Sequence, residues 1–196
     1  SRKVFEEFSF AFEDPQLAKK YFELRDTCRE HNVDFILISG ACGYIYQGRR
    51  PLKDLDILVP ALDDLNKISS ASDIQIEPIS SSYANSQFLN FSSGVELVTD
   101  LSVKYPEDGA DRFVEFNFAD MDRDARTVRF FGENCKIMSP EWLIVFKLCL
   151  ARSGTDDYGH NKNDFADAYD VTISQPIDYA KIAYIANNYQ QARDIM

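Results

Sequence analysis

Two aspartates separated by one residue, Asp54 and Asp56, stand in an apolar segment that covers residues 54–59. Side chains alternate between the faces of a strand, so both carboxylates point to one face with their Cα atoms about 7 Å apart. Like charges on one face repel, and buried carboxylates are costly unless a cation or other partner compensates them. The pattern predicts a divalent-cation site. A solvated strand edge, or Asp54 acting only as a turn cap, is the alternative interpretation.

A glycine turn precedes the two acids. Gly40 directly follows the apolar segment 33–38 and opens a segment, residues 40–48, that we expect to form a short helix. The first N–H groups of a helix lack intrahelical acceptors and lie at the positive end of its dipole, so they favour anions. Glycine also lets a phosphate approach the backbone closely. We therefore expect a phosphate-binding turn beside the cation site.

Four basic residues are candidates for contacting the same anion. Arg49, Arg50 and Lys53 lie in the loop between the turn and the acids, where they would steady a leaving pyrophosphate or simply form a solvated loop. Lys147 interrupts an otherwise apolar helical segment. It would either reach the nucleotide or an active-site acid, or extend its ammonium group to the surface.

A third acid is expected on a neighbouring strand. Residues 94–103 are rich in β-branched and apolar types and carry Glu96 and Asp100, which the two-residue strand period places on one face. Either acid would complete a cluster with the aspartate pair, and for each the alternative is an exposed strand acid. Lys162, Asp164 and Asp167 are interpreted as charges on the surface of a C-terminal helix.

The elements that position these residues follow from periodicity and from helix start and stop signals. The chain is predicted to be α+β, with a mixed sheet and flanking helices. We expect a core over residues 1–138 and a C-terminal helical segment over residues 139–196. Helices are predicted over residues 14–31, 40–48, 62–71, 139–154, 162–173 and 178–195, and strands over 33–38, 54–59 and six segments between residues 74 and 138.

Composition excludes several classes of protein. The 196 residues carry a net charge of −11, which argues against a broad nucleic-acid-binding face. No apolar run of about 18 residues is present, so we expect no membrane span and a cytoplasmic location. The four cysteines, none in a C-x-x-C arrangement, are expected to be reduced and buried, and we predict no zinc site.

The quoted motifs together resemble one superfamily. "ISGACGYIYQG", "LKDLDILV" and "GVELVTDL" are similar to the motifs of the nucleotidyltransferases built around the polymerase-β palm. A helix "SPEWLIVFKLCLARSG" followed by "NKNDFADAYDV" resembles the corresponding part of small prokaryotic members, both stand-alone and toxin–antitoxin-associated. The resemblance covers residues 33–59, 94–103 and about 137–171. It implies a nucleotidyltransferase-like mixed β-sheet.

The resemblance also implies a role for each acid. Asp54 and Asp56 would hold two Mg²⁺ (or Mn²⁺) ions. Glu96 best matches the acid that helps to activate the attacking hydroxyl group, with Asp100 as the alternative for this position.

At the turn, Gly40 would bind the phosphates of an NTP such as ATP, with Ser39 and Ala41 beside it. The superfamily usually has serine or glycine at the position of Ala41, and alanine lacks the hydroxyl group that would bond a phosphate. The implied activity is transfer of an NMP group from an NTP to a hydroxyl acceptor: a protein, a small molecule or an RNA end. The alternatives are a non-catalytic binding or antitoxin-like regulatory module, and phosphohydrolase chemistry on the same metals.

Overall fold

The computed structural model describes residues 16–47, 52, 54–80, 84–104, 113–130, 133–150, 153–155 and 161–188. Within these ranges the main sheet has eight strands in the order β3–β4–β5–β2–β1–β8–β7, with β6 paired to β5. The strands are β1 (Ile36–Ile38), β2 (Leu55–Leu58), β3 (Glu77–Ser80), β4 (Ala84–Ser92), β5 (Val95–Lys104), β6 (Phe113–Glu115), β7 (Arg126–Phe130) and β8 (Glu133–Ile137). The predicted α+β class with a mixed sheet is thereby confirmed.

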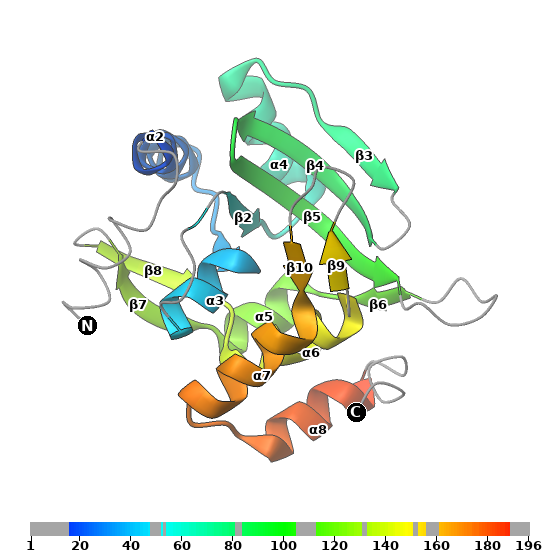
Figure 1. The fold of residues 1–196 in the computed structure, drawn as a ribbon. Coiled ribbons are helices and arrows are strands. Elements are labelled where there is room, and N and C mark those ends of the chain that lie inside the picture. Colours follow the sequence, from blue (N-terminus) through cyan, green and yellow to red (C-terminus); the bar gives the residue numbers. More distant parts are fainter. Residues whose placement is uncertain are drawn as a thin grey trace.

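Helices cover this sheet in two groups (Figure 1). In the first group, α2 and α4 pack against each other and against β5. In the second group, α6 packs on β5, and α7 and α8 lie on the outer side of α6. α3 directly follows β1 and contacts β1, β2, α6 and α7. The helices are α2 (Leu17–Glu30) and α4 (Leu62–Ser72) in the first group, and α3 (Gly40–Gln47), α6 (Pro140–Leu150), α7 (Asp164–Ser174) and α8 (Tyr179–Asn188) on the other side.

The centre of the sheet is a row of buried aliphatic side chains. Leu37 on β1 pairs with Ile57 on β2, which pairs with Leu97 on β5, and all three are fully buried. β1 and β2 run antiparallel, whereas β2 and β5 run parallel. The alternation of side chains sends the neighbouring residues Asp56 and Glu96 to the opposite face of the sheet. The core row therefore fixes which face carries the acids.

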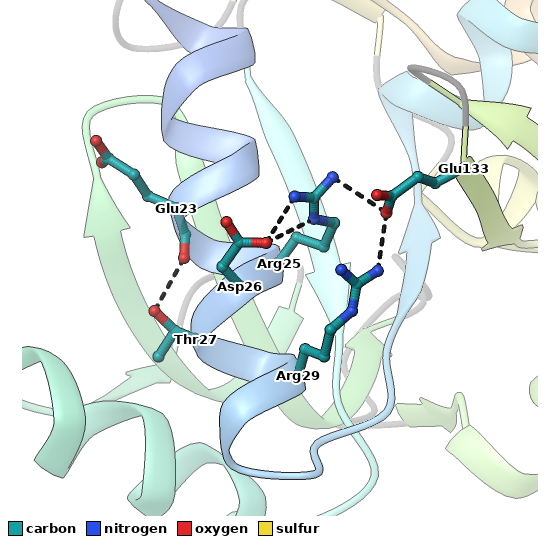
Figure 2. Close-up of polar contacts among 6 residues, drawn as sticks. All are labelled: Glu23, Arg25, Asp26, Thr27, Arg29 and Glu133. Atoms are coloured by element: carbon teal, nitrogen blue, oxygen red, sulfur yellow. Dashed lines mark hydrogen bonds and ion pairs between the residues drawn. The ribbon is translucent and has the colours of Figure 1, made fainter.

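A group of charged side chains joins α2 to β8 (Figure 2). Arg25 and Arg29 both contact the same oxygen of Glu133, at 3.1 and 2.8 Å, and Arg25 also contacts Asp26 at 2.6 Å. These groups are partly or largely exposed, and exposed pairs contribute at most about 1 kcal/mol each to stability. The network links α2 to the start of β8 and adds little to the free energy of folding.

Two parts of the chain differ from the predicted elements. A predicted strand over residues 112–118 is instead β6 followed by helix α5 (Phe118–Asp124), because the side chain of Asn117 caps that helix by accepting from the N–H groups of Ala119 and Asp120. The C-terminal segment is not purely helical either. Between α6 and α7, β9 (Ser153–Thr155) pairs antiparallel with β10 (Asn161–Asn163).

Other boundaries moved by a few residues, and α6 ends at Leu150 rather than at Gly154. The helix predicted over residues 14–31 is α2, which begins at Leu17, and residues 14 and 15 lie outside the described residues. No helix in the described part of the chain combines the length and the apolar character that crossing a membrane requires.

The central row gives a first prediction. Ile57→Ala should lower the free energy of unfolding by about 2–5 kcal/mol, because it leaves a cavity between β1 and β5. Glu133→Ala, which removes the shared acceptor of Arg25 and Arg29, should cost less, at most about 1 kcal/mol for each of the two exposed pairs. Urea unfolding of both variants measures the difference. Equal losses would show that the α2–β8 network contributes as much to stability as the central row.

Candidate active site

The turn between β1 and α3 is the first component of the site. Ser39 adopts a left-handed conformation with φ of 56°, which costs a non-glycine residue roughly 1–2 kcal/mol. Its carbonyl accepts the N–H of Gly43 at 3.1 Å, and its hydroxyl donates a hydrogen bond to the carboxylate of Asp56. The strained residue thus links the start of α3 to the acid on β2.

Gly40 is the first residue of α3 and lies beside the second acid. A Cβ atom built on Gly40 would be 3.9 Å from Oδ1 of Asp54 and 3.9 Å from the side chain of Leu52. These are ordinary contact distances, so the surrounding protein atoms would admit a Cβ atom at this position. The Asp54 carboxylate therefore borders the first turn of α3.

Strand register brings the third acid to the pair. Asp56 and Glu96 are direct partners in the parallel β2–β5 ladder, so their side chains lie side by side on one face. Asp54 precedes β2 and is exposed, while Asp56 and Glu96 are half-buried. Three carboxylates from two strands therefore face the N-terminus of α3.

This crowding shows in the protonation of Asp56. Burial of its carboxylate, and then the negative charges of Asp54 and Glu96, raise the pKa of Asp56 to about 7. The hydrogen bond from Ser39 and the positive charge of Lys147 oppose this shift. Near neutral pH the site is therefore short of positive charge.

The donor set can be compared with what a metal ion needs. In the described ranges, no group of three or more histidine, cysteine, aspartate and glutamate side chains lies close enough to enclose a metal ion. Mg²⁺ typically takes only one or two carboxylates and completes its shell with substrate phosphates and water. Asp54 and Asp56 repel each other when both are charged. They fit a site in which two carboxylates bind the cation and phosphate oxygens and water complete its coordination.

Lys147 approaches the acid cluster from α6. Its side chain is buried, and its Nζ atom lies 3.0 Å from Oδ1 of Asp164 and 3.1 Å from Oδ2 of Asp167. The interpretation of Asp164 and Asp167 as surface charges was therefore wrong, since Asp164 is only 1% exposed. Lys147 does not reach the surface; it contacts Asp164 and Asp167, and its positive charge opposes the rise in the pKa of Asp56.

The other predicted residues lie elsewhere or outside the described part. Asp100 is exposed, has φ of 51°, and lies two residues beyond the last pair of the β2–β5 ladder. There it borders a cavity of about 350 Å³ together with Pro60 and Glu115. The structure thus brings Glu96, and not Asp100, to Asp56.

Three predicted basic residues, Arg49, Arg50 and Lys53, lie outside the described residues. Ala41 is fully buried, so at this turn it can offer a ligand only its backbone N–H. The two cysteines nearest the site in sequence, Cys28 and Cys42, are buried and free, as expected. Cys135 and Cys149 are also buried and free.

Sequence reasoning missed the two acids that hold Lys147. The signal was present, because a lysine within an apolar helix requires a carboxylate partner, and such a partner was available in the next helix. Asp164 and Asp167 are three residues apart, which places them on one face of α7.

The fold was compared with known proteins. No protein-family model matches the chain, and no curated protein matches its sequence. Among solved structures, the crystal structure of ANT(2″)-Ia in complex with adenylyl-2″-tobramycin is similar, with a TM-score of 0.56 and 11% identity over 92% of this chain and 99% of that one. The solution structure of the antibiotic-resistance factor ANT(2″)-Ia gives a TM-score of 0.54 and 12% identity, covering 90% and 92%.

A third similar structure, the lincosamide antibiotic adenylyltransferase LnuA with lincomycin bound, has a TM-score of 0.47 and 17% identity over 80% of this chain and 97% of that one. The chain has the nucleotidyltransferase fold, as its motifs predicted.

The raised pKa of Asp56 predicts how stability changes with pH. An acid whose pKa rises from 3.8 to about 7 on folding binds its proton more tightly in the folded state. Its stabilising contribution is complete below about pH 4 and is lost as the pH rises to about 7. Asp56→Asn removes this loss, so the variant should melt above the wild type at pH 8, by about 2–4 °C per kcal/mol relieved.

The matched control is Asp63→Asn, which neutralises an exposed aspartate on α4. Melting temperatures of the metal-free proteins between pH 5 and 8 provide the measurement. Parallel pH curves for wild type and Asp56→Asn would show that Asp56 ionises as freely in the folded protein as in the unfolded chain.

Proposed function

We propose that this protein is a metal-dependent nucleotidyltransferase that transfers an NMP group from an NTP to a hydroxyl group of a small molecule. The observation that carries the proposal is the pairing of Asp56 with Glu96, with Asp54 next to the first residue of α3. An anion-binding helix end and a cluster of carboxylates meet at one point. A triphosphate with its cation satisfies both.

The turn would bind the triphosphate through its backbone. The first N–H groups of α3 have no intrahelical acceptors, and Gly40 leaves space for phosphate oxygens. The Ser39 hydroxyl is already engaged with Asp56 and would orient that carboxylate. The missing hydroxyl group at Ala41 is then a loss of about one hydrogen bond, worth about 1–3 kcal/mol toward a charged group.

Asp54 and Asp56 would hold Mg²⁺ or Mn²⁺ together with the phosphate oxygens. The bound cation supplies Lewis-acid stabilisation of the charge that develops on the phosphoryl group. It also compensates the mutual repulsion of the carboxylates. Lys147 would add a fixed positive charge on the α6 side of the same group.

In the transfer step, the acceptor oxygen forms a bond to the α-phosphorus while the bond from that phosphorus to the bridging oxygen breaks, and pyrophosphate leaves. Glu96 would take the proton of the acceptor hydroxyl as general base. We keep Arg49, Arg50 and Lys53 as predicted contacts of the leaving pyrophosphate.

The acceptor class is the least constrained part of the proposal. A small molecule is favoured because the chain carries a net charge of −11, which opposes binding of a long RNA. The complex of ANT(2″)-Ia with adenylyl-2″-tobramycin supports the idea that this fold can accommodate a small acceptor. A protein hydroxyl and an RNA end are the other outcomes that the assay below can detect.

Transfer of label from each α-³²P-labelled NTP, with Mg²⁺ or Mn²⁺, to panels of small hydroxyl compounds, proteins and RNA tests the function. We expect labelled product with the wild type and a loss of about 100-fold or more with Asp54→Asn, Asp56→Asn or Glu96→Gln, because the first two weaken binding of the cation and the third removes the general base. Asp63→Asn on α4 is the matched control and should retain activity. Release of free labelled NMP without any labelled acceptor would indicate phosphohydrolase chemistry instead.

The same assay decides between the two candidates for the third acid. Asp100→Asn should keep its activity because Asp100 lies beyond the β2–β5 ladder. If Asp100→Asn loses activity and Glu96→Gln does not, the assignment of Glu96 is overturned. If the wild type neither binds any of the four NTPs in calorimetry nor transfers label, the protein is a non-catalytic module on this fold.

A further inference from the structure

A buried group of three charges lies behind the proposed site. Lys147 of α6 is 7% exposed and Asp164 of α7 is 1% exposed, and their charged atoms are 3.0 Å apart. Asp167, one turn further along α7, contacts the same ammonium group at 3.1 Å. One ammonium is thus held by two carboxylates from a single helix face.

Stability alone does not account for such a group. Desolvating two or more charges costs several kcal/mol, and well-packed apolar residues of similar volume are often as stable or more so. The benefit must then come from where the charge is placed. Helix α6, which carries Lys147, packs against α3, and α3 begins at the proposed phosphate-binding turn.

α7 is also tied to the helix that carries the phosphate-binding turn. Nε2 of Gln47, the last residue of α3, donates to the backbone carbonyl of Asp167 at 3.0 Å. Nε2 of Gln175, directly after α7, donates to the carbonyl of Tyr46 at 2.9 Å. Asp167 therefore contacts the lysine through its side chain and α3 through its backbone. Both hydrogen bonds lie at the C-terminal end of α3, so α7 links that end of the helix to the acids that hold Lys147.

We infer that α7 is the positioning element of the site, and that Asp164 and Asp167 are positioning residues that direct the Lys147 ammonium at the triphosphate. The inference rests on the proposed function, since it presumes an NTP on α3. An ammonium has three N–H donors. Among the described residues, the two carboxylates account for two of them, which leaves one for a phosphate oxygen.

The rival explanation is purely structural: the three charges would only satisfy one another. The two explanations differ in what happens when the three charges are removed as a unit. Asp164→Asn leaves Lys147 with one carboxylate and should lower the melting temperature. Replacing the whole group in the triple variant Lys147→Met/Asp164→Asn/Asp167→Asn leaves no unpaired charge behind and should restore much of the lost stability under either explanation. Only the positioning role requires that nucleotide affinity stay low in this triple variant.

The experiment measures Kd by calorimetry with Mg²⁺ and whichever of the four NTPs the wild type binds most tightly, alongside the melting temperature of each variant. We expect Kd to rise about tenfold or more for Asp164→Asn, Asp167→Asn and Lys147→Met, which is the scale of a hydrogen bond to a charged group. The triple variant Lys147→Met/Asp164→Asn/Asp167→Asn should regain thermal stability and keep the weak Kd. Asp170→Asn, the next acid on α7, is the matched control and should bind as the wild type does.

The outcomes separate the inference from the function on which it rests. If the wild type binds no NTP, the proposed function fails. If the wild type binds an NTP and the folded Asp164→Asn and Asp167→Asn variants bind it with unchanged Kd, only the positioning inference fails. A triple variant that regains both stability and wild-type affinity would likewise show that the charges are structural.

Discussion

The pairing of Asp56 with Glu96 across two parallel strands is the constraint on which the rest of the site depends. It forces two carboxylates onto one face, where Asp54 adds a third charge. The surrounding features all compensate this charge. Ser39 takes a strained backbone conformation from which its hydroxyl bonds Asp56, α3 turns its positive end toward the cluster, and Lys147 is buried behind it.

Much of the fold could be predicted because its elements follow local rules. The apolar strands, the helix that opens at Gly40 and the apolar helix around Lys147 are each set by periodicity and by start signals. α5 was missed because the aromatic residues near Phe118 favour a strand. There the capping amide of Asn117 outweighs β-propensity. The β9–β10 pair was missed because its short polar strands have no apolar alternation.

The residues of the candidate site also divide into those that could be predicted from sequence and those that could not. The glycine turn and the aspartate pair are contiguous in sequence and carry their own spacing signal, so they could be predicted residue by residue. The sequence could not decide between Glu96 and Asp100, because strand register and a local irregularity in β5 determine which of the two lies beside Asp56. For Lys147 the sequence signals that a carboxylate partner is needed, but it does not say which acid, since helix packing brings α6 and α7 together.

The parallel pairing of β2 with β5 also has a kinetic consequence. These strands are joined by a long crossover through α4, β3 and β4, so their contact is non-local. Contacts of this kind form late, after the entropy of closing the connecting chain has been met. Lys147 and α7 arrive later still during synthesis. The carboxylates are therefore apart while the chain emerges, and they meet in a water-excluding setting only once charges from its C-terminal third are available.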